Sequence, residues 1–596
     1  MKHKVSIWNY QEQAANRRES RLARLRDAGY PNPDAEYARL ADEVNRVEPK
    51  SERDWSQQGK RVWHGGHDPE LHANKWLRDC SEAVKPFFSG VVSDVPTIAK
   101  QLADRWGAMM RMCGVFDGKD PHQPARKPIK RLETDEDRAW FRLITNAESF
   151  LNTLHLPFPT GQTVRTAMKR LGKAKWWREQ LNIAIPRIFD QMGRDYHLVH
   201  KNGQIYLTDA AFNVWKSSQR MNRETLQGRI GINDIDQVYS LADLSDKSTS
   251  APHIRRTEMM VRMRGLEEYA QEIGFDKALF ITITAPSKYH SHDQKGVPYA
   301  NWNHSDPRTV NDYLGGVWSR IRADLARREI KYFGVRVAEP HHDGCPHWHL
   351  LIFTRRFDAL DVNATCRHYA LEEDREEKGA RTKRCVIKWI NPERGSAVGY
   401  IAKYISKSID GKGLDKDLEG YDAKDAAARN RAWASTWGIR QFQFFGTAPI
   451  GPWRELRRCR RTVPEPYETA RQAADNAEFA AYLREAVGEG FAVYRDWVNR
   501  KTGEIIDPFN EYGELVTAPI KGVIADGHDP LITRLMDWSI MSLDEARQRG
   551  IVASEARSGE CREAWTCVSN CTRDLFFEPG IIELTNDYLE EVPIPI

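Results

Sequence analysis

One short stretch, Glu339–Phe353, constrains the fold and the chemistry of this chain more than any other. It reads Glu-Pro-His-His-Asp-Gly-Cys-Pro-His-Trp-His-Leu-Leu-Ile-Phe, so His347 and His349 stand at the start of an apolar run typical of a β-strand. Because side chains alternate along a strand, both imidazoles point to one face and Trp348 points to the other. Such a histidine pair alone more often begins a core strand than binds a metal, so a metal site can be inferred only with support from the neighbouring sequence.

The flanking residues predict a β-hairpin. Residues 333–339 and 347–353 are both rich in strand-forming side chains, and the loop between them contains Asp-Gly and two prolines. If the loop closes symmetrically, Glu339 pairs directly across from His347, with Cβ atoms about 5 Å apart, and His349 follows on the same face opposite Val337.

This register predicts a metal site. Two imidazole nitrogens and one carboxylate oxygen, from His347, His349 and Glu339, suit Mg²⁺ or Mn²⁺ acting on phosphate, although these ligands also permit Zn²⁺. Other histidines are rival ligands, two of them in the hairpin loop and two in an upstream polar loop: His341, His342, His290 and His292.

A helix predicted at 396–409 carries the second candidate group. One of its faces holds Tyr400, Lys403, Tyr404 and Lys407, whose spacing of three and four residues places the two tyrosines one turn apart. In an arbitrary helix these would be surface tyrosines beside solvated lysines. Here they follow a candidate metal strand, and a tyrosine hydroxyl beside a cation can attack phosphorus while the lysines hold phosphate charge. The remaining apolar stripe is expected to pack on the sheet: Val398, Ile401, Ala402, Ile405 and Ile409.

The rest of the pattern predicts a multidomain α+β protein. A central domain would combine an antiparallel sheet with flanking helices, from strands at 278–284, 333–339, 347–353, 386–390 and 441–445 and helices at 310–325 and 396–409. Four regions are expected: a basic, partly helical region (1–135), a helical domain (136–260), the sheet domain (261–460) and an acidic C-terminal region (461–596).

Charge and composition limit the classes of binding partner. The first 460 residues contain 76 Lys and Arg against 59 Asp and Glu, whereas residues 461–596 contain 13 against 25. The net positive charge of residues 1–460 suggests that this part of the chain binds a polyanion. No apolar run approaches the roughly 18 residues that span a bilayer, and the first residues do not resemble a signal peptide. Nine scattered cysteines fit a reducing cytoplasm, and a late cluster matches no standard zinc spacing: Cys561, Cys567 and Cys571.

Taken together, these features resemble the HUH endonucleases, named for two histidines flanking a bulky hydrophobic residue, and more narrowly the replication gene A protein family of bacteriophages. The histidine pair and the tyrosine pair are each weak signals alone, but their order and flanking strands are specific. The resemblance covers roughly residues 270–450 and rests on five stretches: Phe280–His290, Trp318–Arg322, Glu339–Phe353, Tyr400–Tyr404 and Arg431–Phe445.

The resemblance implies a rolling-circle replication initiator, a metal-dependent nicking and joining endonuclease. Tyr400 or Tyr404 would attack a phosphate of single-stranded or melted origin DNA, leaving a 5′-phosphotyrosine and a free 3′-OH. Since the sequence contains no Walker-type phosphate loop, a host helicase and a host polymerase are expected partners.

Three alternatives stay open at this point. A relaxase or single-strand transposase of the same superfamily would use similar residues. A non-cutting origin-binding protein would use its tyrosines only for packing or base stacking. A metal-dependent hydrolase would use water and would need no tyrosine.

Overall fold

The computed structural model describes residues 95–112, 135–154, 156–390, 395–412, 422–499 and 503–551. Most of the predicted basic start of the chain lies outside these ranges, as does the cysteine cluster Cys561, Cys567 and Cys571. The chain divides into two compact units. The first contains the residues up to Gln204 with Thr208–Ala211 and Asn499–Thr517, and the second contains Ile205–Leu207, Phe212–Val498 and the residues from Ala518 onward. The finer division into four regions stays a prediction.

The first unit is helical. Its helices are α5 (Val95–Met112), α6 (Asp135–Thr153), α7 (Val164–Leu171) and α8 (Ala174–Asp195). They enclose a core that includes the fully buried Met110, Leu151 and Trp177. The segment Asn499–Thr517 is joined to α7 by an ion pair, in which Arg170 Nη1 lies 2.9 Å from Glu514 Oε1.

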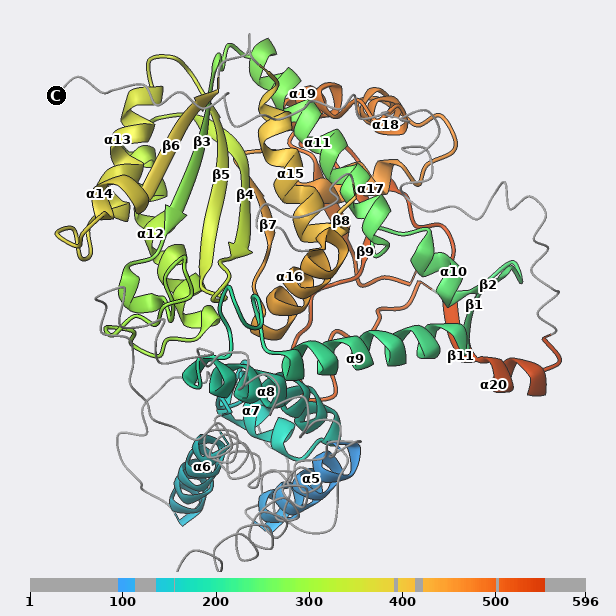
Figure 1. Cartoon of the computed structure of the whole chain (residues 1–596). Helices are drawn as coiled ribbons and strands as arrows, with labels where there is room; N and C mark the ends of the chain where they lie inside the picture. Colours follow the sequence, from blue (N-terminus) through green and yellow to red (C-terminus); the bar gives the residue numbers. More distant parts are fainter. Residues whose placement is uncertain are drawn as a thin grey trace, which may run out of the picture. The chain divides into compact units, whose positions relative to one another are not determined.

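The second unit is built on a five-stranded antiparallel sheet. Its strands are β3 (Lys277–Thr284), β4 (Tyr332–Pro340), β5 (Pro346–Thr354), β6 (Cys385–Ile390) and β7 (Phe442–Phe445), in the order β6-β3-β5-β4-β7 (Figure 1). Each neighbouring pair is antiparallel. All five predicted strands are present within one residue of their expected ends, which confirms the mixed α+β class and the antiparallel sheet.

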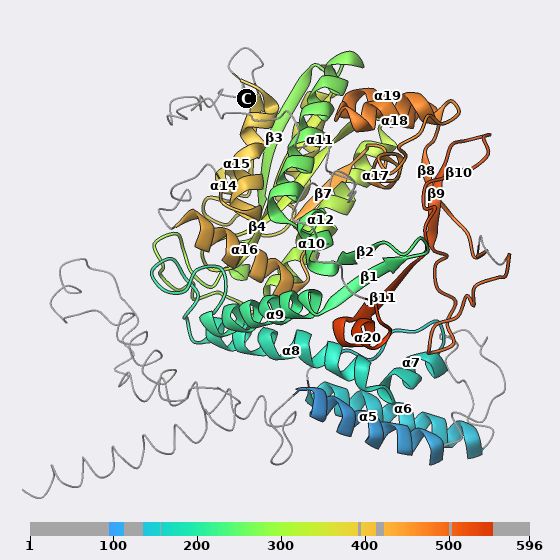
Figure 2. The ribbon, with the colours of Figure 1, turned by 90° about the vertical axis from the view of Figure 1, so that its right-hand side faces the viewer.

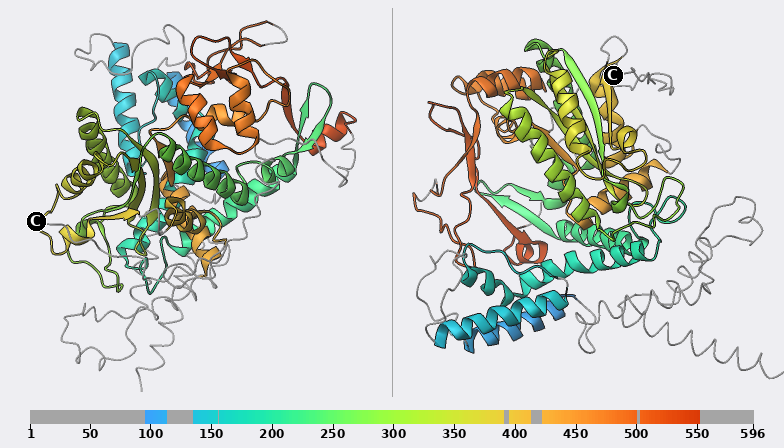
Figure 3. Two further views of the ribbon diagram at one scale, coloured as in Figure 1. Left: turned by 90° about the horizontal axis from the view of Figure 1, so that it is seen from above. Right: turned by 90° about the vertical axis from the view of Figure 1, so that its left-hand side faces the viewer.

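Helices cover both faces of this sheet (Figure 3). On one face lie α12 (Pro307–Arg327) and α13 (Ala359–Ala370), and there the indole of Trp348 is buried and donates a 3.1 Å hydrogen bond to Asn311 of α12. The other face, which carries the two histidines, is covered by α11 (Pro252–Glu272), α15 (Ala397–Ile409) and α16 (Ala423–Trp437). The predicted alternation of the histidines and the tryptophan is therefore confirmed.

Smaller elements complete the second unit (Figure 2). Two additional three-stranded sheets have the orders β11-β1-β2 and β10-β9-β8. Their strands are β1 (Arg229–Asn233), β2 (Val238–Ser240), β8 (Ala492–Arg495), β9 (Ile520–Ile524), β10 (Leu531–Ile532) and β11 (Trp538–Ser542). The remaining helices are α9 (Asp209–Gln227), whose first three residues belong to the first unit, α10 (Leu241–Asp246), η1 (Ser287–Tyr289), α14 (Ala380–Lys383), α17 (Ile450–Leu456), α18 (Tyr467–Asp475), α19 (Phe479–Gly488) and α20 (Leu543–Gln548). Within the described ranges, no helix combines the length and apolar character needed to cross a membrane.

Gly334 in β4 allows the close approach of β5. A Cβ at this position would lie 1.9 Å from the carbonyl oxygen of Leu351, a backbone atom that cannot move aside. We expect Gly334→Ala to lower the free energy of unfolding by about 3 kcal/mol, the upper range for overpacking. Gly316→Ala in α12 is the control, because its nearest neighbour would be Arg320 Nη1 at 3.7 Å. It should raise stability by up to about 1 kcal/mol. Urea unfolding measures both, and equal stability of the two variants would contradict this packing.

Candidate metal and tyrosine site

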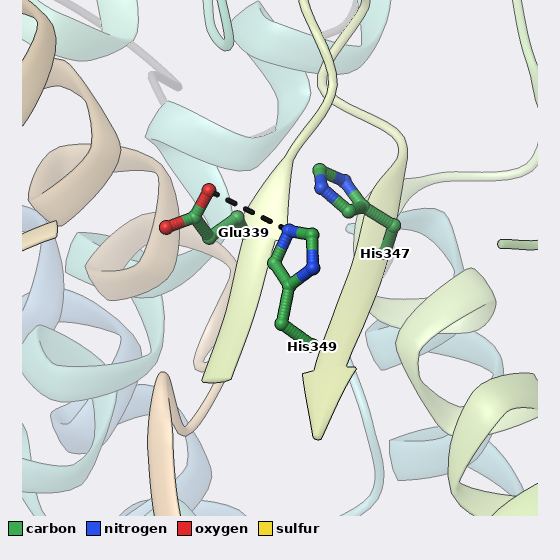
Figure 4. A group of neighbouring side chains, drawn as sticks. All are labelled: Glu339, His347 and His349. Atoms are coloured by element: carbon green, nitrogen blue, oxygen red, sulfur yellow. Dashed lines mark ion pairs between the residues drawn. The ribbon is translucent and has the colours of Figure 1, made fainter. Parts of the chain in front are cut away.

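The hairpin closes in the predicted register. Glu339 pairs with His347 and Val337 pairs with His349, so the carboxylate and both imidazoles leave neighbouring strands on the same face (Figure 4). One ligand atom from each of Glu339, His347 and His349 lies within 4.8 Å of the others. The three residues could hold a metal ion.

The two imidazoles have the protonation state and the free nitrogens that a metal requires. His347 Nδ1 and His349 Nε2 are buried and have no hydrogen-bond partner. The Oγ1 of Thr282 lies 3.0 Å from His349 Nδ1, an interaction that fixes this ring with Nε2 toward Glu339 Oε2, 4.0 Å away. Burial is the largest cause that lowers the pKa of both histidines well below the ordinary value, and the next cause is the neighbouring His349 for His347 and the charge of Lys407 for His349. Both imidazoles are therefore neutral. Neutral imidazoles beside a buried carboxylate fit a divalent cation.

Of the rival histidines, His341 lies nearest the group. Its ring lies 3.9 Å from the His347 ring between centroids, and its buried Nε2 has no hydrogen-bond partner, so it stays a candidate ligand. His290 lies behind it, with ring centroids 5.0 Å apart; its Nδ1 lies 3.0 Å from Asp343, whereas its buried Nε2 also has no hydrogen-bond partner. By contrast, His342 Nε2 lies 2.7 Å from the carbonyl oxygen of Asp293, and His292 Nδ1 lies 2.9 Å from the Ser291 hydroxyl.

The tyrosine helix α15 begins beside α11. The hydroxyl of Ser396 accepts a hydrogen bond from the Val398 amide, and Glu267 of α11 accepts one from the Ala397 amide at 2.7 Å. These caps hold the first turn of the helix, because its amides have no partner within the helix itself.

The helix turns its tyrosine–lysine face toward the histidine face of the sheet. The Tyr404 ring lies 4.1 Å from the His349 ring and 5.3 Å from the Phe280 ring between centroids. Tyr400, one turn earlier, lies 6.3 Å from Phe280. The structure therefore brings Tyr404 directly against the candidate metal group and places Tyr400 farther along the same face.

The expectation that the tyrosines lie on the side of this helix away from the sheet is wrong, because the Tyr404 ring contacts Phe280 and His349 of the sheet. Ile401, Ile405 and Ile409 of the apolar stripe are buried in a cluster that contains side chains of the sheet and also of α11, which runs along α15. Periodicity separates the two faces of a helix, but it does not tell which one meets a sheet when a second helix also needs an apolar partner.

The two lysines of this face have different surroundings. Lys407 is buried, and its Nζ lies 3.6 Å from Glu339 Oε2. Lys403 is half-buried, with its Nζ 5.1 Å from the centre of the Tyr404 ring. Burial, followed by the charge of Lys388, lowers the pKa of Lys403. Burial, followed by the charge of Glu339, raises the pKa of Tyr404, so its phenol is protonated at neutral pH.

A chain of hydrogen bonds that the sequence did not predict holds Glu339, the candidate carboxylate ligand. Ser408 Oγ donates to Glu339 Oε1 at 2.9 Å, and Asn430 Nδ2 donates to that hydroxyl at 3.2 Å. Gln441 Nε2 in turn donates to Asn430 Oδ1 at 2.9 Å, and the Gln441 carbonyl accepts from the amide of Ala338 at 2.7 Å. The network therefore links the Glu339 side chain to the backbone of the preceding residue, Ala338. Ser408 lies four residues after Tyr404, a spacing that could have identified it.

Ser408 should therefore tune the metal affinity through Glu339. We expect Ser408→Ala to weaken binding of Mn²⁺ about tenfold, because residues that orient metal ligands typically contribute 10- to 100-fold. Isothermal titration measures the affinity. Ser406→Ala on the same helix is the matched control and should bind Mn²⁺ like the wild type. An unchanged affinity in Ser408→Ala would show that Glu339 needs no such support.

Comparison with known proteins gives a consistent family. The family model described as Bacteriophage replication gene A protein (GPA) matches residues 146–412, a range that includes all three candidate ligands and both tyrosines. The chain is 38% identical over 436 residues to the "Replication gene A protein" of Escherichia phage 186, which is 71% of this chain and 60% of that protein. No solved structure matches significantly.

Two further relatives agree with this result. The "Replication protein" of Haemophilus phage HP1 is 38% identical over 426 residues, 69% of this chain and 54% of that protein. A "Probable replication endonuclease from prophage-like region" of Salmonella paratyphi A is 32% identical over 430 residues, 69% of this chain and 53% of that protein. The chain spans a little over half the length of the curated relatives it matches. It belongs to the bacteriophage replication gene A protein family.

Proposed function

We propose that this protein initiates rolling-circle replication as an HUH-type endonuclease that nicks and rejoins one strand of a phage or prophage origin. The contact between the Tyr404 ring and the His349 ring, 4.1 Å between centroids, carries this proposal. In this contact a tyrosine ring lies beside residues that suit a divalent cation, in a family whose relatives are named replication proteins and probable replication endonucleases.

The proposed cofactor is Mg²⁺ or Mn²⁺, held by His347, His349 and Glu339. When bound, such an ion polarises the scissile phosphate and stabilises the negative charge that develops on it. Thr282 orients His349, and Ser408 orients Glu339, so both ligands are fixed before DNA arrives. Metal binding needs no large rearrangement of these side chains.

The proposed reaction is a balanced transesterification. The phenol oxygen of Tyr404 forms a bond to phosphorus while the bond from phosphorus to the 3′ oxygen breaks. The phenol loses its proton, and the leaving 3′ oxygen takes one up, so the products are a 5′-phosphotyrosine and a free 3′-OH. Lys403 and Lys407 compensate phosphate charge, Lys407 from its place beside Glu339.

Tyr400 is proposed to act in the second half of the cycle. It lies on the same helix face one turn away, so one metal site can serve both tyrosines in turn. After one round of synthesis it would cut the regenerated origin, and the released 3′-OH would attack the first phosphotyrosine and rejoin the strand. Single-stranded or melted origin DNA is the proposed substrate, and a host helicase and polymerase in the bacterial cytoplasm are the proposed partners.

Labelled single-stranded oligonucleotides that tile the phage or prophage replication region test this function. With Mn²⁺ or Mg²⁺, a 3′ label should migrate with the protein in SDS gels, because the 5′ phosphate stays on tyrosine. A 5′ label should be released on a fragment that a polymerase can extend. Chelation should remove both products. Cleavage without any SDS-stable adduct would indicate water as the nucleophile, and absence of both products across the tiled region and both metals would contradict nuclease function.

A further inference from the structure

The edge strand β6 carries a third lysine to the tyrosine side of the sheet. β6 ends the strand order, and Lys388 pairs with Phe280 of β3. Directly opposed residues share a face, so Lys388 projects to the same side as Phe280, whose ring contacts both tyrosines. Nothing in its sequence pattern distinguishes Lys388 from an ordinary strand lysine, and its neighbours become visible only in the sheet.

Lys388 shares a sheet face with Phe280, whose ring contacts Tyr404, and Lys403 Nζ lies 5.1 Å from the centre of the same Tyr404 ring. In agreement with this placement, the charge of Lys388 contributes, after burial, to lowering the pKa of Lys403. Within the described part of the chain neither has a carboxylate at ion-pair distance, whereas Lys407 is paired with Glu339. Two partly desolvated cations repel each other, and a phosphate group between them relieves that repulsion.

The next residue of the same strand adds an aromatic surface. Trp389 projects to the opposite face of β6, and 38% of it is exposed. Within the described residues its ring has no aromatic partner. Proteins that bind single-stranded nucleic acid combine cations that follow the backbone with exposed aromatic rings that stack on bases. Adjacent strand positions here offer one of each.

We propose that the β6 edge is the track along which single-stranded DNA reaches the tyrosines. Lys388 and Lys403 bind a phosphate adjacent to the one that is attacked, and Trp389 stacks on a base of the same strand. The inference rests on the proposed function and deepens it, because it names the edge of the sheet along which the substrate enters. Lys388 and Trp389 are binding residues and take no part in bond breaking.

The test measures binding of a fluorescent single-stranded oligonucleotide to the full chain over a series of salt concentrations. Each phosphate contact contributes about 0.7 to the slope of log affinity against log salt for single strands. Lys388→Gln should lower that slope by about 0.7, and Lys403→Gln should do the same. Trp389→Ala should weaken binding about tenfold with the slope unchanged, and Trp389→Phe should keep most of the affinity, because stacking is retained.

Lys331→Gln is the matched control, since Lys331 is exposed and immediately precedes β4, which two strands separate from β6 in the sheet. It should match the wild type. An unchanged slope in Lys388→Gln, or unchanged affinity in Trp389→Ala, overturns the proposed track. Adduct formation is measured in parallel. If the wild type forms adducts but the salt slopes of the variants are unchanged, the DNA track is rejected and the nuclease function stands. If the variants show the expected slopes but the wild type forms no adduct, the nuclease function is rejected and the DNA track stands.

Discussion

Replacing Tyr404 by Phe is expected to lower the first strand cleavage about 10⁴-fold or more, the loss typical of removing a covalent nucleophile. Tyr400→Phe should leave this first cleavage near the wild-type rate. The difference follows from position, because the Tyr404 ring contacts His349 at 4.1 Å, whereas the Tyr400 ring lies 6.3 Å from Phe280 and, among the described residues, makes no ring contact with a candidate ligand. The change removes one hydroxyl and keeps both ring contacts, so folding should be unaffected.

Single-turnover cleavage of a labelled oligonucleotide measures this difference. Binding of the uncut oligonucleotide is the control, and both variants should bind like the wild type. Tyr400→Phe should instead fail in the second cleavage, which is measured with a substrate that carries two origin copies. Equal loss of first cleavage in both variants would contradict the assignment of Tyr404 as the first nucleophile.

The second large effect is expected from the histidine pair. His347→Ala combined with His349→Ala should abolish tight Mn²⁺ binding and lower cleavage about 10³-fold, since removing two of the three proposed ligands removes several kcal/mol of transition-state stabilisation. Electron paramagnetic resonance of free and bound Mn²⁺ measures binding independently of activity. His253→Ala, an exposed histidine on α11, is the matched control and should change neither quantity.

The stability of the double histidine variant needs its own measurement, because both side chains are buried. Its thermal unfolding should remain cooperative. A folded variant that still binds Mn²⁺ with wild-type affinity would show that other residues hold the metal. His341 is then the first candidate, since its ring lies against His347.

Much of this site is predictable from local sequence. The alternation of His347, Trp348 and His349 and the near-symmetric loop determine which side chains share a face, so the pairing of Glu339 with His347 follows from strand geometry alone. Helical spacing likewise places Tyr400 and Tyr404 on one face. These predictions succeed because periodicity within a strand or helix depends on backbone geometry rather than on distant partners.

The remaining features depend on tertiary packing. Spacing puts Lys407 on the tyrosine face but does not predict its carboxylate partner: that face turns toward the sheet, and the ammonium of Lys407 pairs with Glu339 in the interior. Asn430 comes from a different helix, and its hydrogen bond to Ser408 has no signature in sequence spacing. Lys388 pairs with Phe280 only because β6 adds to the edge of β3. Sequence periodicity predicts faces, whereas only the fold determines which faces meet.

The identity of the tyrosine that becomes attached to DNA tests the central claim most directly. Trypsin cuts after Lys403, so Tyr400 and Tyr404 fall in different peptides, and mass spectrometry of the adduct after nuclease digestion distinguishes them. The structure predicts that the remaining nucleotide is attached to the peptide Tyr404–Lys407 after the first cleavage. Attachment to a residue outside α15, or cleavage with no attached nucleotide on either peptide, would contradict the account.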